Sequence, residues 1–325
     1  MSAKAIDVSR NKTFFENVTE TISDTISEGI DRLRPNDDFL DKFQDNFRRM
    51  TRRFDAPGPE MRSIETFTVD GVTVHLYVPF GPLPKVGPTL IYAHGGGFVT
   101  CDTKTHEGII RRIANGSLCR VISVDYRLAP RDPFPAGPDD VRTVVEWALS
   151  GKGRKRGIDR KSIAIGGDSA GGNMAAWIAQ AYRHQIRAQL LLYPLMQLID
   201  VRPVNPRPQD WLQIGTVALK YIQDHYVAGA SPTDPRVSPI VENNLKGLPP
   251  AWILTCGLDP LRDEGRLYAE KLRKYGVTVE FRHEKSMPHG FLNFAKAFPK
   301  ANTVPLDAAE FLRRQFPELC EMTAL

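Results

Sequence analysis

The sequence predicts an α/β protein whose mostly parallel sheet, of about eight strands, is covered by helices on both faces. The first observation behind this prediction is an alternation of short apolar segments with stretches of helical periodicity, which is typical of parallel strands joined by helices. The apolar segments are Thr89–Ala93, Val121–Asp125, Ser162–Ile165, Gln189–Tyr193, Trp252–Cys256 and Val277–His283. Each is apolar on both faces, so we expect these strands to be buried from both sides.

The second observation is a hairpin before these segments. Ile64–Val69 and Val72–Val78 flank Asp70-Gly71, which is a strong signal for a two-residue turn. The sheet is therefore expected to begin with an antiparallel pair and to continue with parallel strands.

Two helices are predicted before the hairpin, within residues 13–54. Apolar residues recur at spacings of three or four from Phe14 to Ile30, and again from Phe39 to Phe54 after a start at Asp37 or Asp38. Such an apolar-faced pair must pack on something. It forms either a lid over a site or an extra layer on the core.

Residues 197–238 interrupt the alternation of strands and helices. This segment is rich in proline and carries a helix-like stretch, Asp210–Tyr226. An inserted cap or lid is expected there, so we divide the chain into residues 1–54 and 197–238 as cap segments and residues 55–196 and 239–325 as the core.

Composition excludes several classes of protein. The 325 residues are 42% hydrophobic and 25% charged, an ordinary globular profile. No apolar run approaches the ~18 residues of a membrane helix, and the polar N-terminus shows no secretory signal. The four cysteines have neither Cys-x-x-Cys nor zinc spacing, which favours buried thiols in a reduced, cytoplasmic protein. The net charge of +5 and one basic run, Lys152–Arg156, favour a solvated loop over nucleic-acid binding.

The main candidate for chemistry is the motif Gly-x-Ser-x-Gly, from Gly167 to Gly171, between a predicted strand and a predicted helix. A serine on such a tight turn projects its hydroxyl from the sheet, and small neighbours let the backbone pass. The helix N-terminus that follows favours developing negative charge. A P-loop is excluded because Gly172-Asn173 stands where Lys-Ser/Thr is required, and the Gly-x-Gly-x-x-Gly spacing of dinucleotide sites is absent.

A second glycine-rich sequence, His94-Gly95-Gly96-Gly97-Phe98, directly follows a predicted strand. Three glycines there leave backbone N–H groups free to point at a ligand, and such donors suit the oxyanion of a tetrahedral intermediate. A plain flexible turn is the alternative interpretation.

An acid and a base follow in chain order. Asp259 comes just after one strand and His289 lies in a loop after the next, which gives the order serine, acid, histidine of α/β hydrolases. A serine hydroxyl needs a neutral histidine to take its proton, and a carboxylate must orient that histidine. Asp263 is a second acid, but it falls in the following helix. The other histidines considered lie on predicted strands or helices, where surface or core roles are expected: His75, His106, His184, His225 and His283.

Together these residues resemble the hormone-sensitive-lipase family of α/β-hydrolase esterases, over roughly residues 62–316. The resemblance is carried by five motifs in order: His94–Phe98, Asp125–Pro130 with Phe134–Ala136, Gly167–Asn173, Asp259–Asp263 and His289–Phe291.

The resemblance implies roles for residues of this chain. Ser169 would be the nucleophile, His289 the general base and acid, and Asp259 the residue that orients His289. The oxyanion donors would be the N–H groups of Gly96, Gly97 and Ala170. It also implies that His94 is structural and that the N-terminal helices and the inserted segment build a cap.

The substrate pocket is expected to be apolar. Its candidate residues are Phe98, Asp168, Trp211, Leu212 and Phe291. The aromatic side chains near these loops could equally belong to the core.

The expected function is that of a serine carboxylesterase acting on short- to medium-chain acyl esters, with no cofactor and no metal. An amidase or carbamate hydrolase with the same three residues is the nearest alternative. A non-catalytic small-ligand-binding protein on this fold is less favoured because His289 is present. The expected partner is a small ester, without nucleic-acid binding or membrane insertion, and the resemblance leaves a homodimer open.

Overall fold

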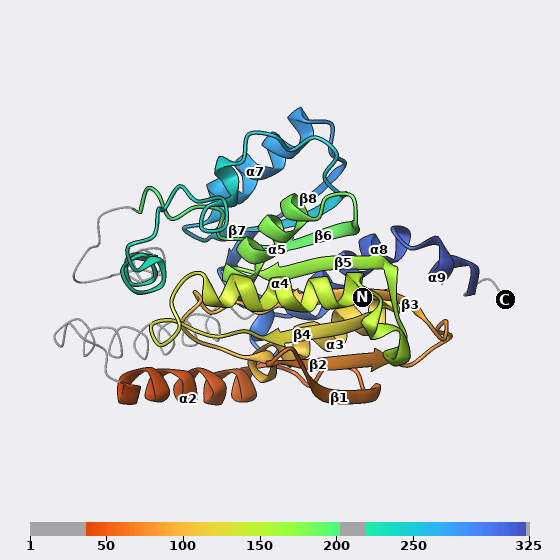
Figure 1. Ribbon diagram of the computed structural model, residues 1–325. Coiled ribbons are helices and arrows are strands. Elements are labelled where there is room, and N and C mark those ends of the chain that lie inside the picture. Colours follow the sequence, from red (N-terminus) through yellow and green to blue (C-terminus); the bar gives the residue numbers. More distant parts are fainter. Residues whose placement is uncertain (1–36, 202–218, 323–325) are drawn as a thin grey trace, which may run out of the picture.

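One eight-stranded sheet forms the centre of the computed structural model, which describes residues 37–201 and 219–322. The strands are β1 (Met61–Val69), β2 (Val72–Pro79), β3 (Gly87–Ala93), β4 (Arg120–Asp125), β5 (Ile158–Asp168), β6 (Ile186–Leu192), β7 (Ala251–Leu258) and β8 (Val279–Pro288). Their order is β1-β2-β4-β3-β5-β6-β7-β8 (Figure 1). Strand β2 pairs antiparallel with β1 and β4, and the other neighbours are parallel. The predicted fold class is confirmed.

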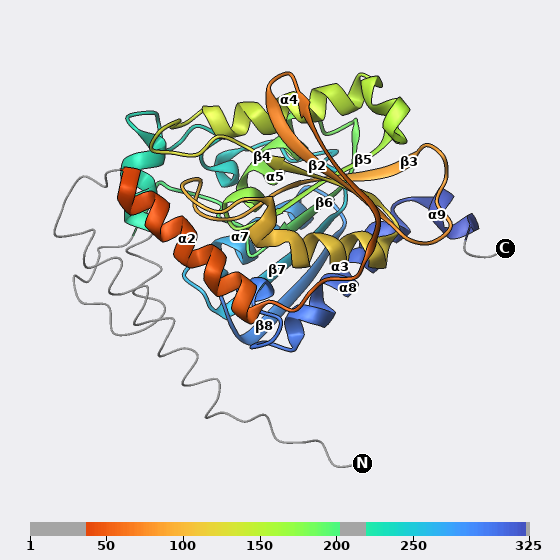
Figure 2. The ribbon, with the colours of Figure 1, turned by 90° about the horizontal axis from the view of Figure 1, so that it is seen from below.

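Helices cover both faces of the sheet. The longer ones are α2 (Asp37–Phe54), α3 (Glu107–Ser117), α4 (Ala136–Leu149), α5 (Ala170–Ala181), α7 (Arg262–Lys274), α8 (Lys300–Arg314) and α9 (Pro317–Met322). The short 3₁₀ or π turns are η1 (Thr103–His106), η2 (Lys152–Arg156), η3 (Gln223–Val227), η4 (Pro239–Val241) and η5 (Phe291–Asn293). Figure 2 shows α4 on one side of the sheet and α3 with α8 on the other.

The two faces have separate apolar cores. Buried residues of α4, α5 and α7 pack together on one face, and those of α3 and α8 pack on the other. Because the central strands contribute side chains to both cores, they are apolar on both faces, which explains the continuous apolar runs in the sequence. Within the described ranges, no helix combines the length and the apolar character needed to cross a membrane.

The predicted hairpin turn is present between β1 and β2. Asp70 and Gly71 both have positive φ, +46° and +92°, and Val69 pairs with Val72 across the turn. Two consecutive positive φ values match the right-handed twist of a hairpin, and the Asp-Gly pair tolerates them.

The segments predicted to form a cap are described in part. Helix α2 begins at Asp37, as predicted, whereas the helix predicted from Phe14 to Ile30 lies outside the described residues. Of the predicted helix-like stretch Asp210–Tyr226, residues 219–226 are described, and they run into the π turn η3. Tyr226 of η3 stacks on Phe98 with ring centroids 3.8 Å apart. The division into core and cap stays a prediction.

Candidate active site

The predicted nucleophile, acid and histidine each follow a strand of the sheet. Ser169 follows β5, Asp259 follows β7, and His289 follows β8. These strands are parallel to one another, so their carboxyl ends meet at one edge of the sheet. Binding sites of open α/β sheets lie at this edge.

Ser169 occupies a strained position between β5 and α5. Its backbone has φ +53° and ψ −117°, which a side chain larger than glycine rarely adopts. The turn is held by hydrogen bonds on both sides of it: the Ser169 N–H donates to Leu192 O at 2.9 Å, and Ser169 O accepts from the N–H of Asn173 at 3.1 Å. These contacts present the hydroxyl at the end of the sheet.

His289 bridges the serine and the acid. Its Nε2 lies 2.9 Å from Ser169 Oγ, and its Nδ1 lies 2.9 Å from Asp259 Oδ2. The Asp259 side chain is fully buried, and its other oxygen accepts the N–H of Leu261 at 2.8 Å. The carboxylate is thereby fixed, and it can hold the imidazole with Nδ1 protonated and Nε2 free to accept a proton.

The electrostatics of His289 follow from the same contacts. Burial lowers the pKa of the imidazole, but the charge and the hydrogen bond of Asp259 outweigh this effect, so the pKa of His289 is raised. Asp168 adds to the increase. The imidazolium form that results from taking up a proton is therefore stabilised at this position.

The glycine loop after β3 lies beside this group. Gly96 and Gly97 have φ of +119° and +63°, and Gly96 O accepts the N–H groups of Val99 and Thr100. The N–H groups of Gly96 and Gly97 have no acceptor among the described residues. Ala170 is the first residue of α5, where backbone N–H groups lack partners within the helix. In the part of the chain that the structure describes, no protein acceptor is therefore bound to the predicted oxyanion donors.

Asp168 supports the start of the glycine loop. Its Oδ1 accepts the N–H of Gly95 at 2.9 Å and the hydroxyl of Tyr92 at 2.8 Å. Its side chain is 3% exposed. Asp168 was predicted as a pocket residue, and the structure places it beneath the loop, facing the protein interior.

His94 holds the loop from the other side. Its ring stacks on Tyr126 with centroids 4.3 Å apart, and its Nδ1 lies 2.7 Å from Gly95 O. Burial, followed by the charge of His106, lowers the pKa of His94 to about 4. The ring is therefore neutral at pH 7, and its Nδ1–H donates to Gly95 O. The Tyr126 hydroxyl donates to His94 O at 2.8 Å.

Two further predicted pocket residues, Phe98 and Phe291, have buried side chains that contact other aromatic rings. Phe98 is 1% exposed and stacks on Tyr226, and Phe291 is fully buried against Tyr193 and Phe298. Both belong to the core, the alternative that the sequence left open. Trp211 and Leu212 lie outside the described residues.

Two residues near the site were not predicted from the sequence. Ile222 covers Gly97, since a Cβ on that glycine would lie 2.6 Å from Ile222 Cδ1. Tyr193 places its ring against His289 at a centroid distance of 5.0 Å, with an unusual φ of +35°. Neither residue lies in a recognisable motif, and only its tertiary contacts reveal its position.

An α/β sheet with a serine on its strand-to-helix turn and an acid and a histidine after later strands defines the class of α/β hydrolases. The chain belongs to this family: a family model described as alpha/beta hydrolase fold matches residues 90–293.

Curated relatives and solved structures agree with this assignment. The chain is 35% identical to the esterase LipI of Mycobacterium tuberculosis over 276 residues, covering 82% of this chain and 85% of LipI. It is 38% identical to the carboxylesterase NlhH of the same organism over 257 residues, covering 75% of this chain and 79% of NlhH. Among solved structures, the ester hydrolase EH1AB1 from the metagenome of Lake Arreo superposes on this chain with a TM-score of 0.77 at 32% identity. The superposition covers 91% of this chain and 97% of EH1AB1, which was solved with a derivative of bipyridine phosphonate. These matches support the resemblance to the hormone-sensitive-lipase family.

Proposed function

We propose that this chain is a serine carboxylesterase that hydrolyses short- to medium-chain acyl esters through an acyl-enzyme intermediate. The observation that carries the proposal is the continuous chain of contacts from Ser169 Oγ through His289 to Asp259, with both distances at 2.9 Å. Relatives named as esterases and carboxylesterases support the reaction type.

The proposed reaction begins when Ser169 Oγ attacks the ester carbonyl carbon and passes its proton to His289 Nε2. The buried charge of Asp259 stabilises the imidazolium. The carbonyl oxygen becomes an oxyanion, which accepts the N–H groups of Gly96, Gly97 and Ala170. His289 then protonates the leaving alcohol, and a water molecule releases the acyl group by the same steps.

The preference for short to medium acyl chains is supported by the residue above the loop. Ile222 is 7% exposed and lies against Gly97, so it limits the room beside the proposed oxyanion hole. The expected cytoplasmic location is supported by Cys101, Cys119 and Cys256, which are buried and free. A homodimer stays a prediction.

The proposal is tested with p-nitrophenyl esters from acetate to laurate. Wild type should hydrolyse them with a maximum at short or medium chains, and Ser169→Ala should lose about 10⁶-fold in kcat. Ser150→Ala, which changes an exposed serine of the α4 C-terminus, should match wild type. In a second assay, a p-nitrophenyl phosphonate should add one phosphonyl group to wild type and none to Ser169→Ala, as measured by intact mass.

Three outcomes are distinguished. Hydrolysis lost only in Ser169→Ala supports the esterase. Cleavage of p-nitroanilides without cleavage of esters would replace it with an amidase. A folded wild type that neither turns over esters nor is labelled by the phosphonate would overturn a catalytic role and favour a binding protein on this fold.

A further inference from the structure

A second histidine–aspartate pair lies beneath the site, where no step of the proposed reaction uses it. His106 Nε2 is 3.2 Å from Asp168 Oδ2, and the two side chains are 1% and 3% exposed. His106 ends the turn η1, and Asp168 immediately precedes Ser169. A buried carboxylate at this position is expected to have a counter-charge, because an isolated buried charge is costly.

The surroundings of His106 indicate where its protons are. Nδ1 lies 2.9 Å from Thr105 Oγ1 and 3.3 Å from Asp102 O. The hydroxyl of Thr105 already donates its proton to Asp102 O at 2.7 Å, so Thr105 Oγ1 can only accept from the ring. Both neighbours of Nδ1 are therefore acceptors, and Nδ1 carries a hydrogen.

The other ring nitrogen also faces an acceptor. Nε2 points to the carboxylate of Asp168, which accepts the hydrogen bonds of Gly95 and Tyr92 on its other oxygen. With hydrogens on both nitrogens, His106 is an imidazolium.

The amide of Asn293 also lies beside Nε2 and is compatible with this assignment in one of its two orientations. Its Nδ2 lies 3.3 Å from His106 Nε2, while its buried Oδ1 has no partner among the described residues. The oxygen and nitrogen of an amide are assigned from their hydrogen bonds. Exchanging them places an acceptor beside Nε2–H.

The charges around the ring favour the same state. Burial lowers the pKa of His106, but the charge and hydrogen bond of Asp168 outweigh it and raise the pKa, and Asp102 acts in the same direction. His94, with its ring centroid 5.6 Å away, is neutral at pH 7 and adds no competing charge.

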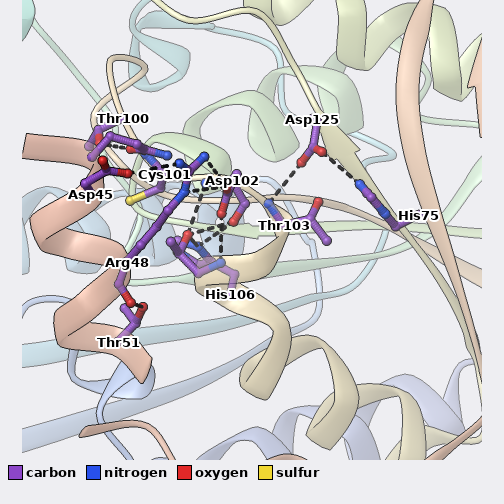
Figure 3. A network of polar contacts seen from close by, with 12 residues as sticks. Asp45, Arg48, Thr51, His75, Thr100, Cys101, Asp102, Thr103, His106 and Asp125 are labelled. Carbon is purple, nitrogen blue, oxygen red and sulfur yellow. Dashed lines mark hydrogen bonds and ion pairs between the residues drawn. The ribbon is translucent and has the colours of Figure 1, made fainter. Parts of the chain in front are cut away.

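The turn that carries His106 is attached to helix α2. Arg48 of α2 donates to Asp102 Oδ2 from Nε at 3.0 Å and from Nη2 at 2.7 Å. The Asp102 side chain also accepts the N–H of Thr105 at 2.9 Å. Figure 3 shows Arg48, Asp102 and His106 in one network. The position of His106 is thus fixed from two sides, by the turn and by Asp168.

We infer that His106 is a positioning residue of the esterase: as a buried cation it holds the Asp168 carboxylate against the N–H of Gly95 and so sets the geometry of the oxyanion loop. The inference rests on the function proposed above. The polar contacts of His106 are with Thr105, Asp102, Asp168 and Asn293, so within the described residues it acts on the loop through Asp168. If the loop moves so that the oxyanion donors shift by about 1 Å relative to the substrate, the rate of the chemical step is expected to fall about 100-fold.

The first experiment measures the charge state of His106 directly. Long-range ¹H–¹⁵N spectra of the full chain labelled with ¹⁵N-histidine distinguish an imidazolium from the two neutral tautomers. The His106 signals are assigned by their loss in His106→Gln. Imidazolium signals that persist at pH 7.5 are expected in wild type, and a neutral tautomer would overturn the inference. This readout needs no turnover, so it remains decisive even if no ester is hydrolysed and the proposed function fails.

The second experiment separates positioning from mere stability. In folded His106→Gln, kcat should fall about ten- to hundred-fold with KM nearly unchanged. The acid limb of kcat/KM should move to lower pH, because the buried Asp168 carboxyl takes up a proton when it loses its counter-charge and then no longer raises the pKa of His289. Asp168→Asn should move that limb to lower pH. His75→Gln is the control, since it breaks another histidine–aspartate pair, His75 Nε2 to Asp125 Oδ2 at 2.8 Å, that does not include Asp168, while Asp125 Oδ1 keeps the N–H of Thr103. A loss of kcat without a shift of the limb, or an unchanged kcat, would refute the positioning role.

Discussion

Gly171 approaches Ala93 so closely that a Cβ on Gly171 would lie 2.0 Å from the carbonyl oxygen of Ala93. The first turn of α5 is therefore in direct contact with the end of β3. This contact places the serine turn beside the glycine loop, because Ser169 precedes the helix and Gly95 follows the strand within two residues. The last glycine of the Gly-x-Ser-x-Gly motif is therefore required because there is no room for a side chain beside β3, and not because its backbone has a positive φ.

Gly171→Ala should destabilise the protein by several kcal/mol, because the clashing atom belongs to the backbone and cannot turn away. Gly276→Ala is the matched control: Gly276 has φ +77°, with open space around the position of a Cβ. It should cost only about 1–2 kcal/mol of left-handed strain. Urea unfolding of the three proteins measures both values. Equal losses in the two variants would show that helix α5 can move away from β3 at little cost.

The rate of ester hydrolysis should fall on acidification with a midpoint above pH 6.5. Attack by Ser169 needs neutral His289, and the pKa of this imidazole is raised above its ordinary value by Asp259 despite burial. The measurement is kcat/KM from pH 5 to 9, which reports the free enzyme. In Asp259→Asn, kcat should drop about 10⁴-fold, and the midpoint of the residual activity should fall, since burial then acts without the carboxylate. A wild-type midpoint below pH 6.5 would contradict the assignment.

The strands were predictable because burial leaves a local signature. The apolar run Ser162–Ile165 marks only the middle of β5, which extends from Ile158 to Asp168. Its first half contains the exposed polar residues Arg160 and Lys161, so periodicity cannot distinguish that part from a loop. Its end consists of Gly166, Gly167 and Asp168, whose small or charged side chains carry no strand signal.

The residues of the site could be predicted where each of them directly follows a strand. Ser169, Asp259 and His289 each come just after a strand, and topology then brings them to one edge. Ile222 and His106 have no such signal. His106 was expected to have a core or surface role, and the reason it is charged lies in Asp168, 62 residues further along the chain. Contacts of this range depend on packing that single-sequence patterns do not encode.

Stability should decrease as pH rises from about 5 to 8, in part through Glu264. Desolvation raises the pKa of this carboxyl to about 8 from an ordinary 4.5. Between these values the folded state holds a proton that the unfolded state has released, so the free energy of unfolding falls with increasing pH, by up to about 1.4 kcal/mol per pH unit for one group. Below pH 4.5 this contribution is fully present.

Glu264→Gln isolates this effect. Glu264 Oε2 accepts the N–H groups of Met196 and Gln197 at 2.7 and 2.8 Å, and an amide oxygen can accept both. Urea unfolding at pH 5.5 and 8.5 should show a smaller loss for the variant than for wild type. Glu270→Gln, on the exposed face of the same helix α7, should behave as wild type. An equal pH dependence of the free energy of unfolding in all three proteins would show that a group other than Glu264 takes up the proton.

Acyl-chain preference should respond to the side chain above Gly97. Ile222→Ala removes the group that lies against this glycine, and the space gained borders the proposed oxyanion hole. Because one methylene in an apolar pocket changes binding by about 1–3 kcal/mol, the ratio of kcat/KM for octanoate to that for acetate should rise about ten-fold. Val227→Ala is the matched control, since Val227 is 5% exposed on the same segment but is not among the atoms nearest to Gly97. Its ratio should stay at the wild-type value. An equal shift in both variants would mean that loosening of the segment, and not space at Gly97, selects the acyl chain.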